Sequence, residues 1–136
     1  MAAAVAESGA RSIAMIQAWR GERAIVIAER FLAAWRMLLT GTEFRAGCAV
    51  LAVTTSTDSS DVLDDAGSVF RSWREELASL LAEGGLAADR ALAVATMLIA
   101  SAEGAVVMSR AERRIDPFDE VAAEVLARVT ALVEER

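Results

Sequence analysis

Apolar residues recur at every third or fourth position along most of the chain, which is the spacing of one buried side of an α-helix. The pattern predicts helices over residues 2 to about 20, 22 to 39, 60 to 83, 88 to 109 and from 116 to the C-terminal end. Within the first of these, Gly9 is expected to interrupt the pattern, so that the start of the helix frays. Glycine also follows three of the expected helices, at Gly21, Gly41 and Gly84.

The run from Cys48 to Ser56 is short and apolar, and its pattern fits either a buried strand or a short helix. Because no second strand is predicted, a lone strand would leave its backbone groups unpaired. We therefore expect a short buried helix. Asp116-Pro117 predicts the start of the last helix, with Asp116 as the cap and Pro117 in the first helical position. The expected fold is all-α, with about six helices in one domain over residues 1–136.

The stretch from Ala91 to Ser109 has the least ordinary composition, because Glu103 is the only ionisable residue between Arg90 and Arg110. A helix that is apolar nearly all round is buried on several sides or lies in a membrane. This stretch is slightly shorter than the roughly 20 residues of a spanning helix. An acid inside it would also be costly in lipid. We therefore expect a buried helix and no contact with a membrane.

The central and last helices together offer more apolar surface than the other four helices are expected to cover. Small residues along one side of the central helix would also let another helix approach closely. We therefore predict a homodimer in which these two helices and their symmetry mates form a four-helix bundle. The predicted interface residues are Ala95, Leu98, Ala102, Ala105, Ser109, Phe118, Val121 and Val125.

Glu103 needs a partner or a raised pKa if its helix is buried. An arginine of the same chain (Arg20, Arg23 or Arg36), a bound ligand and a pair at a subunit interface are the alternatives. The charged residues after the central helix, Arg110 to Arg114, are expected to form a solvated turn.

Aromatic and methionine side chains lie on or beside the helix stripes. They could simply fill the core, or they could line a pocket for a flat, apolar small molecule. Cys48 is ambiguous in a similar way, because a small buried cysteine and a reactive thiol differ only in their surroundings. The residues predicted to bind a ligand are Met15, Trp19, Trp35, Cys48, Leu51, Phe70, Trp73, Met97, Ser101 and Glu103.

Composition limits the chemistry that the chain can perform. The formal net charge is −6, every basic residue is an arginine, and histidine is absent, so we expect no direct contact with nucleic acid. Without histidine or lysine there is no Ser–His pair, imidazole ligand or Schiff base, and we predict no catalytic residues, metal site or cofactor. An enzyme working with carboxylates alone would need two converging acids, and only Glu103 lies on the buried stripes. The N-terminal residues do not resemble a signal peptide, so a cytoplasmic location is expected.

Several segments resemble tetracycline-repressor-type (TetR) regulators of the LmrA/YxaF-like branch. They are Phe31-Leu-Ala-Ala-Trp35, Phe44-Arg-Ala-Gly-Cys48, Leu98-Ile-Ala-Ser-Ala-Glu-Gly-Ala105, Ser109-Arg-Ala-Glu-Arg113 and Asp116-Pro-Phe-Asp119, and the similarity covers roughly residues 25 to 130.

This resemblance implies an all-helical domain that senses a hydrophobic effector and dimerises through its last two helices. Such regulators begin with a helix-turn-helix domain. The chain shows no such domain, and its first helix would correspond to the connecting helix that follows it. The expected function is effector sensing that controls DNA binding by an N-terminal domain absent from this chain. The alternative is a stand-alone helical dimerisation module with no ligand.

Overall fold

The computed structural model describes residues 2–135, and within them it confirms an all-α fold. The six helices are α1 (Ala2–Gln17), α2 (Ala24–Gly41), α3 (Ala49–Ser56), α4 (Ser60–Glu83), α5 (Ala88–Glu112) and α6 (Asp116–Glu134). The ambiguous run after Cys48 is helical, as predicted. The glycine predictions for α2 and α4 also agree with the structure, since α2 ends at Gly41 and Gly84 caps α4.

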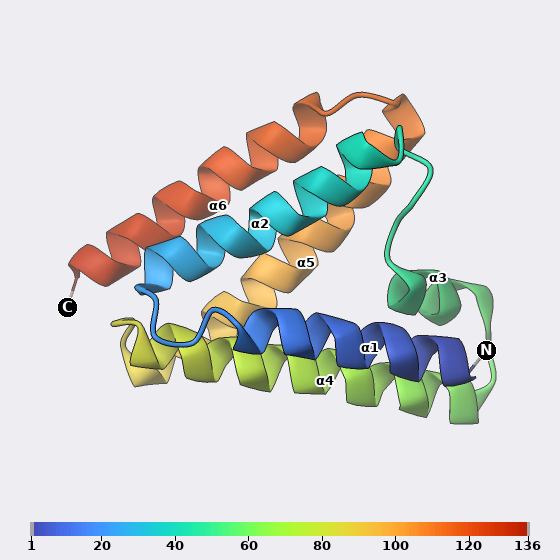
Figure 1. The fold of residues 1–136 in the computed structure, drawn as a ribbon, viewed down its shortest axis with the longest axis horizontal. Coiled ribbons are helices and arrows are strands. Elements are labelled where there is room, and N and C mark those ends of the chain that lie inside the picture. Colours follow the sequence, from blue (N-terminus) through green and yellow to red (C-terminus); the bar gives the residue numbers. More distant parts are fainter. Residues whose placement is uncertain (1, 136) are drawn as a thin grey trace.

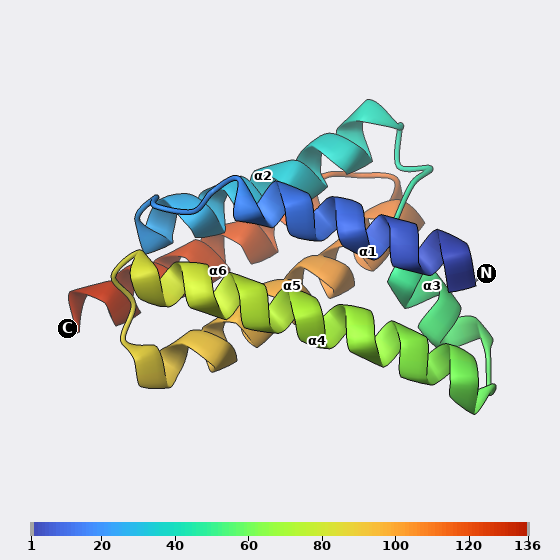
Figure 2. The same cartoon turned by 60° about the horizontal axis from the view of Figure 1, so that its bottom comes forward.

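Helix α5 lies at the centre of the arrangement, where it packs against α2, α4 and α6. Helices α1 and α4 lie side by side along one edge, and α2 and α6 cover another side of α5 (Figure 1). The turned view in Figure 2 shows the same neighbours, with the short α3 at the end where α1 begins. The longest apolar helix thus contacts three others and is partly buried by them.

The expected fraying at Gly9 is wrong, because α1 continues unbroken through this residue. A Cβ atom at Gly9 would lie 2.9 Å from a methyl carbon of Val69 on α4. The indole Nε1 of Trp73, also on α4, donates a hydrogen bond to the carbonyl oxygen of Gly9 over 3.3 Å. Gly9 therefore allows close contact between α1 and α4.

The boundary between α5 and α6 differs from the prediction in two details. Helix α5 extends through Arg110 to Glu112, and Arg113 ends it in a left-handed conformation with φ 54°. Asp116 is the first residue of α6, and Ile115 precedes it as the cap. Both helices are joined by the buried Ser109, whose hydroxyl accepts a hydrogen bond from the backbone N–H of Phe118 over 3.0 Å.

Most residues predicted for the dimer interface lie inside the core of the single chain. Within α5, Ala95, Leu98, Ala102, Ala105 and Ser109 are at most 1% exposed. Phe118 and Val125 of α6 are buried as well, and Val121 is half-buried. These side chains face the helices of their own chain, so they leave little surface for a second copy.

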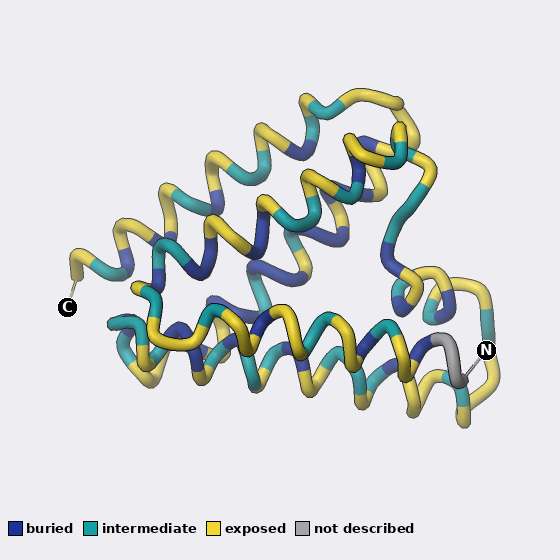
Figure 3. Tube along the Cα trace, viewed as in Figure 1, coloured by how far each residue is buried: buried dark blue, intermediate teal, exposed yellow. Residues whose placement is uncertain are grey.

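A different side of α5 faces solvent, and we refer to it as the outer face of α5. No charged residue lies on this face between its two ends. Figure 3 shows how exposed and buried positions alternate along the helices. The outer face consists of the exposed residues Ala93, Ala100, Gly104, Val107, Met108 and Ala111.

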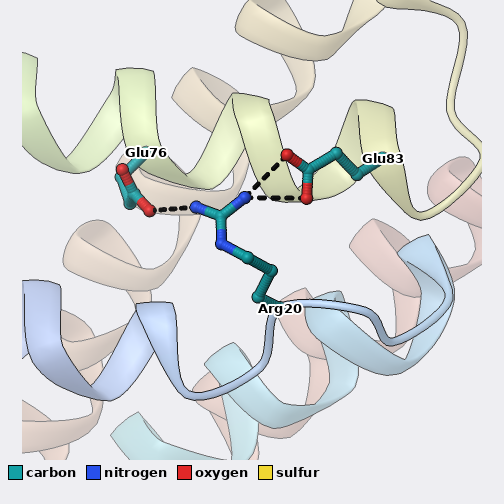
Figure 4. A network of polar contacts seen from close by, with 3 residues as sticks. All are labelled: Arg20, Glu76 and Glu83. Carbon is teal, nitrogen blue, oxygen red and sulfur yellow. Dashed lines mark hydrogen bonds and ion pairs between the residues drawn. The ribbon is translucent and has the colours of Figure 1, made fainter.

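Arg20, in the turn after α1, joins that turn to the side of α4. Its guanidinium contacts the carboxylate of Glu83 at 2.6 Å and that of Glu76 at 2.7 Å (Figure 4). Both acids raise the pKa of Arg20. Because all three side chains are partly exposed to water, the network orients α1 on α4 without contributing much to stability.

Candidate functional site

A cavity of about 480 Å³ lies between α1, α2, the start of α3 and α4. This volume falls within the range of small-molecule sites. Its walls are mainly apolar and include three aromatic rings, with serine hydroxyls and one arginine on the α1 side. The lining residues are Ser8, Arg11, Ser12, Met15, Ile16, Phe31, Ala34, Trp35, Leu38, Gly47, Cys48, Ala49 and Trp73.

The aromatic walls are held in fixed orientations by neighbouring rings. Phe31 and Trp35 are one helical turn apart on α2 and meet edge to face, with ring centroids 6.5 Å apart. On α4, Trp73 packs edge to face on Phe70, with centroids 5.5 Å apart. Trp73 is 3% exposed, and its indole N–H is already bonded to Gly9, so its ring cannot rotate freely.

The segment between α2 and α3, residues 42–48, closes one end of the cavity with Gly47 and Cys48. Arg110 holds this segment, because its guanidinium donates hydrogen bonds to the carbonyl oxygens of Phe44 (3.2 Å) and Arg45 (3.0 Å). A Cβ atom at Gly47 would lie 2.9 Å from the Arg110 guanidinium, so the glycine permits this contact. The prediction that Arg110 belongs to a solvated turn is therefore incomplete, because its hydrogen bonds connect the segment that closes the cavity to the end of α5.

The solvent-exposed edge of the cavity, its mouth, includes Arg11 and Met15 of α1. Arg11 is paired there with Glu7, one turn earlier, at 3.3 Å, and both side chains are more than 70% exposed. The pair leaves little net charge at the mouth.

Four of the ten residues predicted to bind a ligand line this cavity: Met15, Trp35, Cys48 and Trp73. The other six lie outside the lining. Trp19 is in the turn after α1, Leu51 is on α3, and Phe70 is on α4, where it meets Trp73 edge to face. The remaining three are on α5, namely Met97, Ser101 and Glu103. Whether the four lining residues bind a ligand stays a prediction.

The sequence pattern could have identified some of the residues that were missed. Phe31 and Leu38 lie on the same α2 stripe as Trp35, at helical spacing, so extending that stripe would have included them. The α1 residues Ser8 and Ser12 gave no such signal, because polar residues on a helix usually face solvent.

Glu103 is buried without the arginine partner that was one of the alternatives. It is 6% exposed, and neither carboxyl oxygen has a hydrogen-bond partner of ordinary geometry among the described residues. Arg20 contacts Glu76 and Glu83 instead, and Arg36 forms two hydrogen bonds, of 2.9 and 3.1 Å, with Asp119.

The thiol of Cys48 lies beside the buried carboxyl. Burial raises the pKa of Cys48 to about 12, and the charge of Glu103 acts in the same direction. Burial also raises the pKa of Glu103, while the interaction with the Cys48 thiol lowers it to a smaller degree. Because a thiolate is the reactive form of cysteine, the structure gives Cys48 no nucleophilic character near neutral pH.

A second depression, of about 500 Å³, lies between residues 43–45 and the end of α5. Most of the residues around it are charged or lie at the exposed end of a helix, including Glu43, Arg45 and Arg113. Since small-molecule sites are mainly apolar, the cavity with aromatic walls is the stronger candidate.

The sequence matches the family described as "Transcriptional regulator LmrA/YxaF-like, C-terminal domain", over residues 24–124. Two curated relatives, each named "Uncharacterized HTH-type transcriptional regulator", come from two strains of Mycobacterium tuberculosis. Each is 29% identical to the chain over 140 aligned positions, which cover 98% of the chain and 71% of the relative. No solved structure matches the chain.

Proposed function

Because the chain belongs to the C-terminal domain family of LmrA/YxaF-like, TetR-type transcriptional regulators, we propose that it is an effector-sensing and dimerising domain of a repressor. The family consists of transcriptional regulators and is not a class of enzymes. The proposed effector is an apolar small molecule. Its binding would control the attachment to DNA of a helix-turn-helix domain, the domain type named for the mycobacterial relatives.

The cavity between α1, α2 and α4 is the observation that carries this proposal. Its volume of about 480 Å³ lies within the range of small-molecule sites, and Phe31, Trp35 and Trp73 contribute aromatic rings to its lining. Large, orientationally fixed aromatic side chains bind apolar ligands with little loss of side-chain entropy.

Trp73 also suggests how occupancy of the cavity would reach α1. One side of its indole lines the cavity, and its N–H is bonded to the backbone of α1 at Gly9. A ligand that displaces the indole would therefore change how α1 packs against α4. Under this proposal, α1 leads to the DNA-binding domain, and the ligand shifts a two-state equilibrium through its different affinities for the two states.

The outer face of α5 is the proposed dimer interface. An uncharged strip containing Ala100, Gly104 and Val107 allows close approach of a second helix, and its exposed apolar side chains gain by being covered. Self-association through this face would place α5 and α6 of two chains in a four-helix bundle. This proposal keeps the predicted homodimer but moves the contact from the buried side of α5 to the exposed one.

The regulator is proposed to act in the cytoplasm. Helix α5 is long and apolar enough to cross a membrane by length and composition alone. Half of its most apolar stretch is buried inside the fold, however, as is usual for the core helix of a soluble protein.

The cavity is tested by titrating the chain with N-phenylnaphthylamine, a neutral apolar fluorophore that brightens on leaving water. We expect saturable binding to the wild-type chain. Trp73→Ala should weaken this binding by about tenfold or more, because it removes an aromatic wall worth roughly 1.5 kcal/mol. Trp19→Ala, which removes a tryptophan outside the lining, should leave the affinity unchanged.

The oligomeric state of both variants is measured alongside by sedimentation velocity. Weaker probe binding by Trp73→Ala with an intact dimer supports the proposal. Equal loss of binding and dimerisation would mean that Trp73 is only a core residue. Absence of saturable binding to the wild-type chain would favour a dimerisation module without a ligand.

A further inference from the structure

Glu103 is the one ionisable residue in the middle of α5, and the fold buries it there without a hydrogen-bond partner of ordinary geometry for either oxygen. An unsatisfied buried carboxyl destabilises a protein compared with a satisfied or apolar side chain. Each such group in a folded protein calls for a physical explanation.

Among the described residues, no arginine of the packed helices forms a hydrogen bond or ion pair with Glu103. Arg36 of α2 binds Asp119, and Arg74 of α4 reaches the hydroxyl of Thr96 at 3.5 Å. On α5 itself, Arg110 donates to the backbone of the segment between α2 and α3. The neighbouring titratable group is therefore the thiol of Cys48, which is a weak donor and cannot neutralise a carboxylate.

Cys48 belongs both to this pair and to the cavity. Its side chain lines the cavity wall and also interacts with Glu103, so the carboxyl lies one side chain behind that wall. Opposite charges a few ångströms apart attract each other much more strongly in such a protected site than in water. The aromatic rings of Trp35 and Trp73 on the other walls would also attract a cation.

We propose that the Cys48–Glu103 pair forms an acidic end of the cavity and selects apolar aromatic ligands that carry a basic nitrogen. This inference rests on the proposed ligand-binding function. The ligand would enter with its ammonium group toward Cys48, where the Glu103 carboxylate attracts it. A Glu103 side chain that is protonated before binding would lose its proton to the solvent. In that step the O–H bond of the carboxyl breaks, water or buffer takes up the proton, and the ammonium replaces its positive charge.

The arginine at the mouth of the cavity does not oppose this selection. Arg11 is paired with Glu7, and its side chain is 72% exposed, so solvent and the paired carboxylate screen its charge. The net charge of −6 also favours the approach of cations to the chain.

Three naphthalene probes of similar shape test the inference: naphthylmethylamine, naphthylmethanol and naphthylacetate. Isothermal titration calorimetry in two buffers with different ionisation enthalpies gives both the affinity and the number of protons exchanged. For the wild-type chain we expect the amine to bind at least about tenfold more tightly than the alcohol, because a carboxylate one side chain away attracts a cation strongly in a site shielded from water. Binding of the amine should also release protons, because the ammonium lowers the raised pKa of Glu103, and the release should fall to zero at a pH well above that pKa.

Glu103→Gln should abolish both the preference for the amine and the proton release while retaining binding of the alcohol. Glu124→Gln is the matched control, since it removes the same charge from the exposed side of α6 and should leave the preference intact. Cys48→Ala provides an independent variant. It removes the side chain between Glu103 and the cavity and should increase the preference for the amine.

The outcomes separate this inference from the proposed function. If the alcohol binds the wild-type chain as tightly as the amine, ligand binding in the cavity is supported and selection by the Cys48–Glu103 pair is refuted. Preferential binding of naphthylacetate would mean that Arg11 sets the charge preference, which also overturns the inference. If none of the three probes binds, the ligand-binding function fails and the inference fails with it.

Discussion

Helices α4 and α5 have almost the same length, 24 and 25 residues, and pack against each other, yet their solvent-facing sides differ in chemistry. The exposed side of α4 is mainly charged or polar, with Leu63 as its exposed large apolar side chain. Its charged and polar residues are Asp61, Asp64, Asp65, Ser68, Arg71, Ser72, Glu75 and Ser79. The outer face of α5 is small or apolar, and the single acid in the middle of that helix points inward.

The difference distinguishes a surface that is complete in one chain from one that is not. Water can hydrogen-bond to the polar side chains on the exposed side of α4, so this side needs no contact with another molecule. On α5, neither the outer face nor Glu103 finds a suitable partner within the described chain. We interpret the outer face as the place of a second copy and Glu103 as the place of a ligand.

The largest effect is expected from placing a charge on each helix at an equivalent exposed position. Ala100→Arg puts a guanidinium in the middle of the outer face of α5, where dimerisation would bury it against its symmetry mate. Like charges brought together cost several kcal/mol. We expect self-association to weaken by about a hundredfold or more, as measured by sedimentation equilibrium.

Ser79→Arg on α4 is the matched control. It adds the same side chain to an exposed helical position, and we expect the dimer to be unaffected. Circular dichroism should show the same helix content for both variants. A dimer that survives Ala100→Arg but dissociates with Ser79→Arg would reverse the roles assigned to the two helices.

An intermediate effect is expected from removing the buried acid. Glu103→Met keeps an unbranched side chain of similar length and replaces an unsatisfied carboxyl with an apolar group. We predict an increase of about 1–3 kcal/mol in the free energy of unfolding, measured by urea denaturation. Glu124→Met at an exposed position of α6 should change it little, and destabilisation by Glu103→Met would show that the carboxyl is well accommodated.

The difference in unfolding free energy between Glu103→Met and the wild-type chain should depend on pH in a defined direction. Because burial raises the pKa of Glu103 in the folded chain, the unfolded chain loses this proton first as the pH rises. The wild-type chain should therefore lose stability relative to Glu103→Met from the ordinary pKa of a glutamate up to the folded pKa. Asp119, whose pKa is lowered by Arg36, acts in the opposite direction at lower pH but contributes equally to both chains. A stability difference independent of pH would contradict the raised pKa.

The smallest effect is expected at the solvated edge of α4. Arg20→Gln removes the contacts with Glu76 and Glu83, which are ion pairs between partly exposed groups. We expect the melting temperature to fall by no more than about two degrees at low salt. This difference should shrink further in concentrated salt, because exposed charges are screened. A large decrease in melting temperature that persists in concentrated salt would show that the Arg20 contacts stabilise the packing of α1 on α4 strongly.

The helices were predictable from the sequence because their apolar stripes are regular and glycine lies at two of their ends. The continuation of α1 through Gly9 was not, since a glycine inside a helix signals interruption unless the close neighbour, Val69, is known. The extension of α5 to Glu112 was missed because charged residues were taken to mark a turn.

The sites were less predictable for a related reason. A helix that is apolar all round has no stripe that tells which side is buried, so the interface prediction fell on the inner side of α5 at Ala95 and Ala102. For the cavity, the α2 stripe was informative at Trp35, whereas the contribution of α1 at Ser8 depends on how two helices meet in space. The isolation of Glu103 from every arginine likewise requires the fold.

Native mass spectrometry of the wild-type chain, with and without N-phenylnaphthylamine, tests the central claim most directly. The account predicts a dimer that takes up one probe molecule per chain, and a Trp73→Ala dimer that takes up much less. A monomer that binds no probe would contradict both the interface on α5 and the cavity beside Trp73.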